Sequence, residues 1–159
     1  NIDTYIESLY AEDESQPAIT GENIIPNADF SHGLDGWWVS KNPNGVCVQT
    51  DEEGLFVSAG TNFDFSVTRQ LYIKHPGRYV LSVDYRGTNT TGVEVELFMT
   101  KITADGEKTY TKTIYPSDVR YVTHALDAVE LTEGHVNIGI KMHTPPVFAK
   151  IKQFSLVVI

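Results

Sequence analysis

The chain is 159 residues long, with 21 acidic and 12 basic side chains and a formal net charge of −9 at pH 7. This length corresponds to one ordinary domain, which buries roughly two-thirds of the surface that its unfolded form exposes. The excess negative charge argues against nucleic acid or an anionic membrane surface as a partner, because both are bound through Lys and Arg. A neutral partner is therefore favoured.

The single cysteine and the lack of long apolar runs narrow the class of protein further. Cys47 lies in the apolar alternation of residues 46–48, so it is expected to be a half-buried strand thiol rather than a nucleophile or metal ligand. No window approaches the run of about 18 apolar residues that spans a bilayer, and a signal-peptide pattern is missing at the N-terminus. We expect a soluble domain, either cytosolic or part of a secreted protein.

Residues 1–22 differ in composition from the rest of the chain. They contain an acidic run at residues 12–15, followed by the structure breaker Pro17. Their apolar side chains recur at near-helical spacing: Ile2, Tyr5, Ile6, Leu9 and Tyr10. This segment is expected to be a linker or N-terminal extension, either a short helix or the tail of an upstream module, that docks on the domain at residues 23–159.

Residues 23–37 combine a hydrophobic entry, a turn-rich middle and a Gly-Trp exit. Residues 24–25 are expected to start a strand. Gly33 and Gly36 supply the positive φ angles of tight turns, and Trp37 begins the next strand.

From Asn23 onward, apolar and polar residues alternate with a period of two, and helical periodicity is not convincing in any ten-residue segment. The alternation is clearest at residues 79–85, 93–99, 136–142 and 154–158, with Gly- and Pro-containing turns between them. About ten short strands with such turns predict an antiparallel sandwich. Its interior is expected to contain Leu81, Val83, Val95, Leu97, Ile138 and Ile140.

The segment 23–37 resembles the opening of carbohydrate-binding modules with a galactose-binding-domain-like jelly-roll fold. The usual family form is Asn-Leu-Ile-x-Asn-Gly-Asp-Phe-Glu/Ser-x-Gly-x-x-Gly-Trp, from which this chain departs at Ala28. Residues 67–86, where a Gly-x-Tyr opens the second of two paired strands, and residues 149–156 are also similar to the family. The resemblance covers roughly residues 23–159 and implies an all-β, antiparallel jelly-roll β-sandwich.

Neutral sugars are bound by an aromatic ring that packs on the C–H face of a pyranose, together with planar groups that hydrogen-bond its hydroxyls. In a jelly-roll, such a site lies on the outer face of the concave sheet or in the loops at one edge. Phe98 is the one aromatic residue in an otherwise polar outward set, so it is either a ligand platform or an isolated surface residue. The expected exposed set is Asp84, Arg86, Glu96, Phe98, Asn137, Lys141 and His143.

Trp37 and Trp38 are adjacent, so in a strand they point to opposite faces. The resemblance puts Trp37 toward the core, which leaves Trp38 either as a stacking surface for sugar or covered by a loop or the N-terminal segment. Tyr110, Tyr115 and Tyr121 either line an edge cleft or occupy strand positions with half-buried rings.

Asp84 and Arg86 are two apart on one strand face, where they either hold each other in place for a ligand or form a solvated ion pair. His143, beside two prolines, either accepts a hydrogen bond from a sugar hydroxyl or is a lone surface histidine. The predicted ligand-binding set is Trp38, Asp84, Arg86, Phe98, Asn137 and His143.

Many relatives in the family that the chain resembles carry a structural calcium near the first and last strands. Here Ser31 stands at the carboxylate position after the first Phe, and Lys152 and Gln153 replace the closing acidic pair. A Lys ammonium repels calcium, and this cation needs several oxygen ligands. We therefore expect no metal and no cofactor. Three residues nevertheless offer oxygens: Asn27, Asp29 and Asp35.

Catalysis finds little support, because Gly-x-Ser-x-Gly, His-Glu-x-x-His and phosphate-loop motifs are missing from the sequence. Glu94 and Glu96 share a strand face, and two carboxylates can hydrolyse a glycoside, but such pairs are frequent on solvated faces. We expect no enzyme activity. The alternatives are a structural or protein-interaction sandwich with Phe98, Trp38 and the tyrosines at the interface, and a small jelly-roll hydrolase or lyase acting through the two glutamates.

The resemblance implies a non-catalytic module that holds an adjacent glycoside hydrolase on a plant cell-wall polysaccharide, which raises the effective substrate concentration. The implied polymers are β-1,4-galactan, xylan and β-glucan, and we favour galactan. The expected localisation is extracellular. The expected partners are a neutral polysaccharide and the catalytic module, without nucleic acid or membrane.

Overall fold

The computed structural model describes residues 20–40, 46–59, 63–90, 93–144 and 147–159. The expected extension at residues 1–22 lies outside them except for residues 20–22. The described part contains the strands β1 (Trp38–Val39), β2 (Val46–Asp51), β3 (Gly54–Ala59), β4 (Phe63–Ile73), β5 (Gly77–Gly87), β6 (Glu94–Thr103), β7 (Gly106–Ile114), β8 (Val122–Ala125), β9 (Val129–Leu131), β10 (Gly134–Thr144) and β11 (Val147–Val158). Within these ranges we find no helix with the length and apolar character that a membrane crossing requires.

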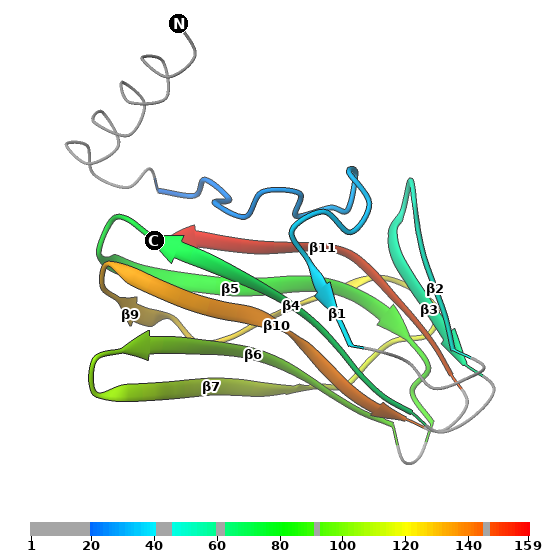
Figure 1. Cartoon of the computed structure of the whole chain (residues 1–159). Helices are drawn as coiled ribbons and strands as arrows, with labels where there is room; N and C mark the ends of the chain where they lie inside the picture. The colour runs from blue at the N-terminus through cyan, green and yellow to red at the C-terminus, as the bar shows by residue number, and fades with distance from the viewer. Residues whose placement is uncertain (1–19, 41–45, 60–62, 91–92, 145–146) are drawn as a thin grey trace, which may run out of the picture.

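The strands form two antiparallel sheets that pack face to face (Figure 1). The five-stranded sheet has the order β1-β4-β10-β6-β7. The six-stranded sheet has the order β2-β3-β11-β5-β8, with β9 also paired to β5. Because most connections cross from one sheet to the other, the fold is an all-β jelly-roll sandwich, as predicted.

The period-two alternation of the sequence places the core between the sheets. The interior residues predicted from it are at most 2% exposed. They are Leu81, Val83, Val95, Leu97, Ile138 and Ile140. Cys47 lies in β2, opposite Ser58 of β3, in agreement with its expected strand position. Removal of the apolar side chains between the two sheets from water provides the main drive for folding.

The segment before β1 runs beside β11 without forming the strand expected at residues 24–25. The backbone amide of Ile24 donates to the carbonyl of Leu156 at 3.0 Å. The Asn23 side chain adds to this contact, because its Oδ1 accepts from the amides of Ile25 and Leu156 and its Nδ2 donates to the carbonyl of Phe154. The next strand, β1, starts at Trp38, one residue later than predicted.

The loop that precedes β1 is held together by the side chain of Asn27. Its Nδ2 donates to the carbonyls of Gly33 (3.1 Å) and Asp35 (3.0 Å), and its Oδ1 accepts from the amide of His32 at 2.8 Å. Gly33 and Gly36 have φ angles of 66° and 81°, which confirms their predicted turn conformations. The loop leads into β1, which is an edge strand of the five-stranded sheet.

Candidate functional site

The outer face of the five-stranded sheet aligns residues from distant parts of the sequence. Neighbours in a cross-strand row lie about 5 Å apart. One row runs Trp38, Thr68, Gly139, Phe98 and Thr111; the next runs Ser66, Lys141, Glu96 and Thr113; the third runs Asp64, His143 and Glu94. The sheet order therefore places Trp38 at one edge and polar side chains across the middle.

A groove of about 550 Å³ lies over the second and third rows. Its outward-facing lining residues are Ser40, Asp64, Ser66, Glu94, Glu96, Thr113, Lys141 and His143. Ser40, Asp64, Ser66 and Thr113 were missed by the sequence reasoning. The alternation of Asp64 and Ser66 with the aromatic and apolar residues of β4 was the signal that could have identified them.

Trp38 provides an exposed aromatic surface beside this groove. Its residue is 61% exposed, and it lies two positions before Ser40, which lines the groove. Trp37 is only 7% exposed and packs with ring centroids 4.9 Å from those of Phe30 and Phe154. The predicted division between a buried and an exposed tryptophan is therefore confirmed.

Phe98 lies on the outer face as expected, but the prediction that its ring is exposed was wrong, because only 4% of the residue is accessible. Gly139 opposite it has no side chain, and a Cβ atom there would be 3.1 Å from the Phe98 ring. The Lys141 ammonium lies 4.8 Å from the ring centroid. The ring thus fills the space left by the glycine, with Lys141 over it.

The expected single exposed set is also corrected. Asp84 and Arg86 alternate with the buried residues of β5 and lie on the outer face of the six-stranded sheet. Asn137 and His143 belong to β10 and lie on the outer face of the other sheet. Sequence alternation separates inside from outside, but it does not assign a strand to a sheet.

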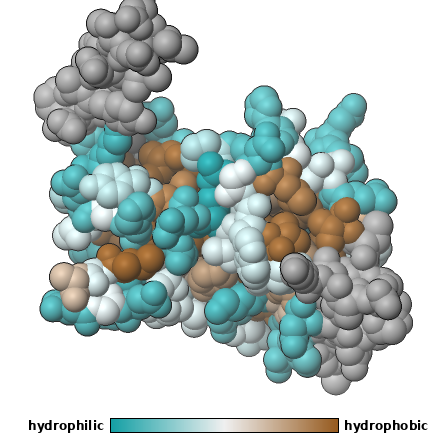
Figure 2. Space-filling model, viewed as in Figure 1, coloured by the Kyte–Doolittle hydropathy of each residue, from teal (hydrophilic) through white to brown (hydrophobic). Residues whose placement is uncertain are grey.

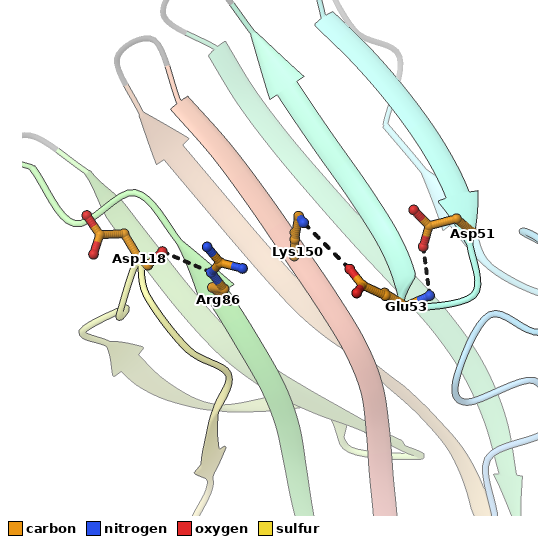
Figure 3. Close-up of polar contacts among 5 residues, drawn as sticks. All are labelled: Asp51, Glu53, Arg86, Asp118 and Lys150. Atoms are coloured by element: carbon orange, nitrogen blue, oxygen red, sulfur yellow. Dashed lines mark hydrogen bonds and ion pairs between the residues drawn. The ribbon is translucent and has the colours of Figure 1, made fainter.

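Asp84 and Arg86 have separate partners on the six-stranded sheet. The Nε of Arg86 donates to the backbone carbonyl of Asp118 at 2.9 Å (Figure 3). The carboxylate of Asp84 instead accepts from the Thr123 hydroxyl. The expected pairing of Asp84 with Arg86 is therefore replaced by contacts that tie β5 to the segment leading into β8 and to β8 itself.

Lys150 lies beside Arg86 on the neighbouring strand β11. Its ammonium is 3.6 Å from the Glu53 carboxylate (Figure 3) and 5.5 Å from the centroid of the Phe56 ring. The Arg86 guanidinium lies 5.7 Å from the Phe148 ring centroid. Arg86 and Lys150 thus each contact an aromatic ring, and each has an oxygen partner as well: a backbone carbonyl for Arg86 and a carboxylate for Lys150.

His143 is a titratable residue in the lining of the groove. Its Nδ1 bonds the carboxylate of Asp64, and Glu94 lies opposite it on β6. The hydrogen bond and the negative charge of Asp64, with a smaller contribution from Glu94, raise the pKa of His143. Asn137 is half-buried and lies one row beyond Gly139, away from the groove.

The three tyrosines considered for an edge cleft have different surroundings. Tyr110 is half-buried and packs against the core. Tyr115 directly follows β7 and is 84% exposed. Tyr121 is half-buried, the Lys152 ammonium lies 5.8 Å from its ring centroid, and burial raises the pKa of its hydroxyl.

Two of the residues considered for calcium, Asn27 and Asp29, have other contacts. Both polar groups of the Asn27 side chain are used within its own loop. The Asp29 carboxylate accepts from the Ser31 amide, and Lys152 lines the same groove of about 660 Å³ as Asp29. Across the described ranges, no group of three or more His, Cys, Asp or Glu side chains is arranged to hold a metal.

Comparison with solved structures finds the same fold in several carbohydrate-binding modules. TmCBM61 in complex with β-1,4-galactotriose has a TM-score of 0.68 and 16% identity, over 87% of this chain and 100% of that chain. A family 16 carbohydrate-binding module has a TM-score of 0.63 and 15% identity, over 85% and 99%.

The same fold also occurs inside a larger protein. The enzymatically active domain of tailspike protein 4 from bacteriophage CBA120 has a TM-score of 0.65 and 17% identity, over 86% of this chain but only 21% of that chain. No protein-family model and no curated protein sequence matches this chain. The likeness at these identities shows the jelly-roll fold of carbohydrate-binding modules, in agreement with the resemblance seen in residues 23–37.

Proposed function

We propose that the chain is a non-catalytic carbohydrate-binding module that takes a neutral plant cell-wall polysaccharide at the groove beside Trp38. One observation carries the proposal: Trp38, a residue that is 61% exposed, lies beside a groove whose lining includes several polar side chains. An aromatic ring packs on the C–H face of a sugar, and polar side chains bond its hydroxyls.

The galactotriose complex of TmCBM61, a protein of the same fold, makes β-1,4-galactan the first polymer to test. Xylan and β-glucan follow. In this proposal the module works outside the cell and keeps an attached glycoside hydrolase close to its substrate. Tethering of this kind raises the local concentration of substrate without any new contact at the active site.

The buried position of Phe98 weakens the alternative in which this face is a protein interface, because that hypothesis used Phe98 as an exposed aromatic. In the space-filling view, hydrophobic residues appear as separate patches among hydrophilic ones (Figure 2). The hydrolase alternative relied on Glu94 and Glu96. They face His143 and Lys141 across the β6–β10 pair, an arrangement that also occurs on solvated sheets with no catalytic role.

Titration calorimetry of wild type and Trp38→Ala against galactan, xylan and β-glucan tests the proposal. We expect the variant to lose affinity by about tenfold or more, because a central stacking residue carries a large share of the binding energy. Phe56→Ala is the matched control, since it removes an aromatic ring from the opposite sheet, and it should retain affinity. A folded wild type that binds no polymer of a broad panel contradicts the proposed function.

A further inference from the structure

The charges that line the groove are unequal. Three carboxylates, those of Asp64, Glu94 and Glu96, face it. Among the described lining residues, Lys141 is the one permanent cation, and His143 carries a charge only when it is protonated. The groove is therefore negative at neutral pH.

Both cationic groups already have partners on the same face. The Lys141 ammonium lies 4.8 Å from the centroid of the Phe98 ring and opposite Glu96 across the β10–β6 pair. His143 bonds Asp64 through its Nδ1 and faces Glu94 on the other side. A carboxylate on a ligand would have to compete with these contacts for either cation.

Building on the proposed function, we propose that Glu94 and Glu96 are specificity-determining residues, which make the groove accept uncharged sugar chains and repel chains that carry uronate carboxylates. Like charges brought together across an interface disfavour the wrong partner. Asp64 is not assigned this role, because its carboxylate is hydrogen-bonded to the His143 ring. The selectivity thus comes from β6, whose two glutamates are two residues apart on the outer face.

This selectivity depends on salt, because the side chains are accessible to solvent. A unit charge at about 4 Å in water alters the binding constant of a ligand charge by about fivefold. The Debye length falls from about 30 Å at 0.01 M salt to about 3 Å at 1 M salt. Discrimination against uronates is therefore expected at low salt and should shrink as salt is added.

The experiment uses one polymer in three forms, so that only its charge changes. The polymer is galactan or β-glucan, whichever wild type binds. It is compared with the same polymer after partial oxidation of its primary hydroxyls to carboxylates, and with the oxidised polymer after methyl esterification. Affinity is measured by titration calorimetry at about 0.01 M and about 1 M salt.

Wild type should bind the oxidised polymer at least about fivefold more weakly than the native polymer at low salt, and the ester should recover most of this loss. In Glu94→Gln/Glu96→Gln, the ratio of oxidised to native affinity should rise toward one. Glu53→Gln/Glu130→Gln changes the net charge equally, but Glu53 lies in the turn between β2 and β3 and Glu130 lies in β9, both away from the groove. This matched control should keep the wild-type ratio.

The possible failures are distinguishable. If wild type binds neither galactan nor β-glucan, this inference is refuted. The proposed function itself is refuted only if xylan and the rest of a broad panel also fail to bind. If wild type binds the native and oxidised polymers equally at low salt, only the charge selectivity is overturned. If the oxidised polymer and its methyl ester bind equally weakly, the charge selectivity is also overturned. The loss of affinity would then come from the size of the added group. A ratio that is unchanged in Glu94→Gln/Glu96→Gln removes these two residues from the role.

Discussion

Gly139 lies directly opposite Phe98 on the neighbouring strands β10 and β6, and the missing side chain leaves the space in which the Phe98 ring is buried. The strand β4 approaches the same glycine from the other side. A Cβ atom at position 139 would lie 1.9 Å from the backbone carbonyl oxygen of Val67. The close packing of β4 and the Phe98 ring at the centre of the candidate binding face therefore depends on Gly139.

Gly139→Ala should destabilise the protein by about 1–3 kcal/mol, because an added methyl group forces the backbone of β4 or the Phe98 ring to move. Urea denaturation measures the change in the free energy of unfolding. Thr111→Ala, an exposed substitution on the same face, serves as the control and should stay within about 0.5 kcal/mol of wild type. Equal stability of Gly139→Ala and wild type would contradict the close approach of the strands.

The two tryptophans should respond to truncation in opposite ways. Trp37→Ala removes a buried ring that packs against Phe30 and Phe154 and donates its Nε1–H to the Asn27 carbonyl at 2.9 Å. The cost should be about 3–5 kcal/mol. Trp38→Ala removes an exposed ring and should change stability by no more than about 0.5 kcal/mol. Thermal unfolding of both variants checks this, and a similar loss in the two would contradict the assignment.

Asn27 combines a φ angle of 52° with three side-chain hydrogen bonds inside its loop. Asn27→Gly loses the bonds but tolerates the backbone conformation, and it should cost about 1–3 kcal/mol. Asn27→Ala also strains the backbone, so it should be less stable than the glycine variant by about 1 kcal/mol. The free energies of unfolding of the two variants in urea separate the loss of hydrogen bonds from the backbone strain. If the variants are equally stable, backbone strain is unimportant at this position.

The sequence predicts the inside and outside of the sandwich well, because the period of a strand is two and the core excludes polar side chains. It correctly identified the interior of β5, β6 and β10 and the exposure of Trp38. These features depend only on local alternation.

The sequence does not predict which residues meet across strands. Phe98 alternates with buried residues, and only the register that puts Gly139 beside it explains why it is also buried. Asp84 and Glu96 looked equivalent, although the chain crosses from one sheet to the other between them. The groove joins β4, β6, β7 and β10, and no local motif reports such long-range pairing.

Asp64 should control the titration of His143. The hydrogen bond to Asp64 and its charge raise the pKa of His143 above the ordinary value of about 6.5. A raised folded-state pKa stabilises the protein below the unfolded-state value, and this contribution is lost as the pH rises through the folded-state value. NMR titration of the His143 ring should show the raised pKa.

Asp64→Asn should move the His143 titration back toward about 6.5. Glu94→Gln should move it less, because Glu94 makes the smallest contribution. A larger change in Glu94→Gln than in Asp64→Asn would show that the histidine pairs with β6 in solution rather than with β4.

Calcium should have little effect on stability. A metal that binds only the native state adds about 2.7 kcal/mol at a concentration of 100 times its dissociation constant, so a functional site would make the melting temperature depend on calcium. Here the Asn27 side chain is hydrogen-bonded within its loop, and Lys152 lines the same groove as Asp29. Melting temperatures with chelator and with added calcium should therefore agree. A large drop with chelator that calcium restores would mean that the carboxylates of Asp29 and Asp51, which share this groove, bind the ion despite the lysine, and Asp51→Asn would then abolish the restoration.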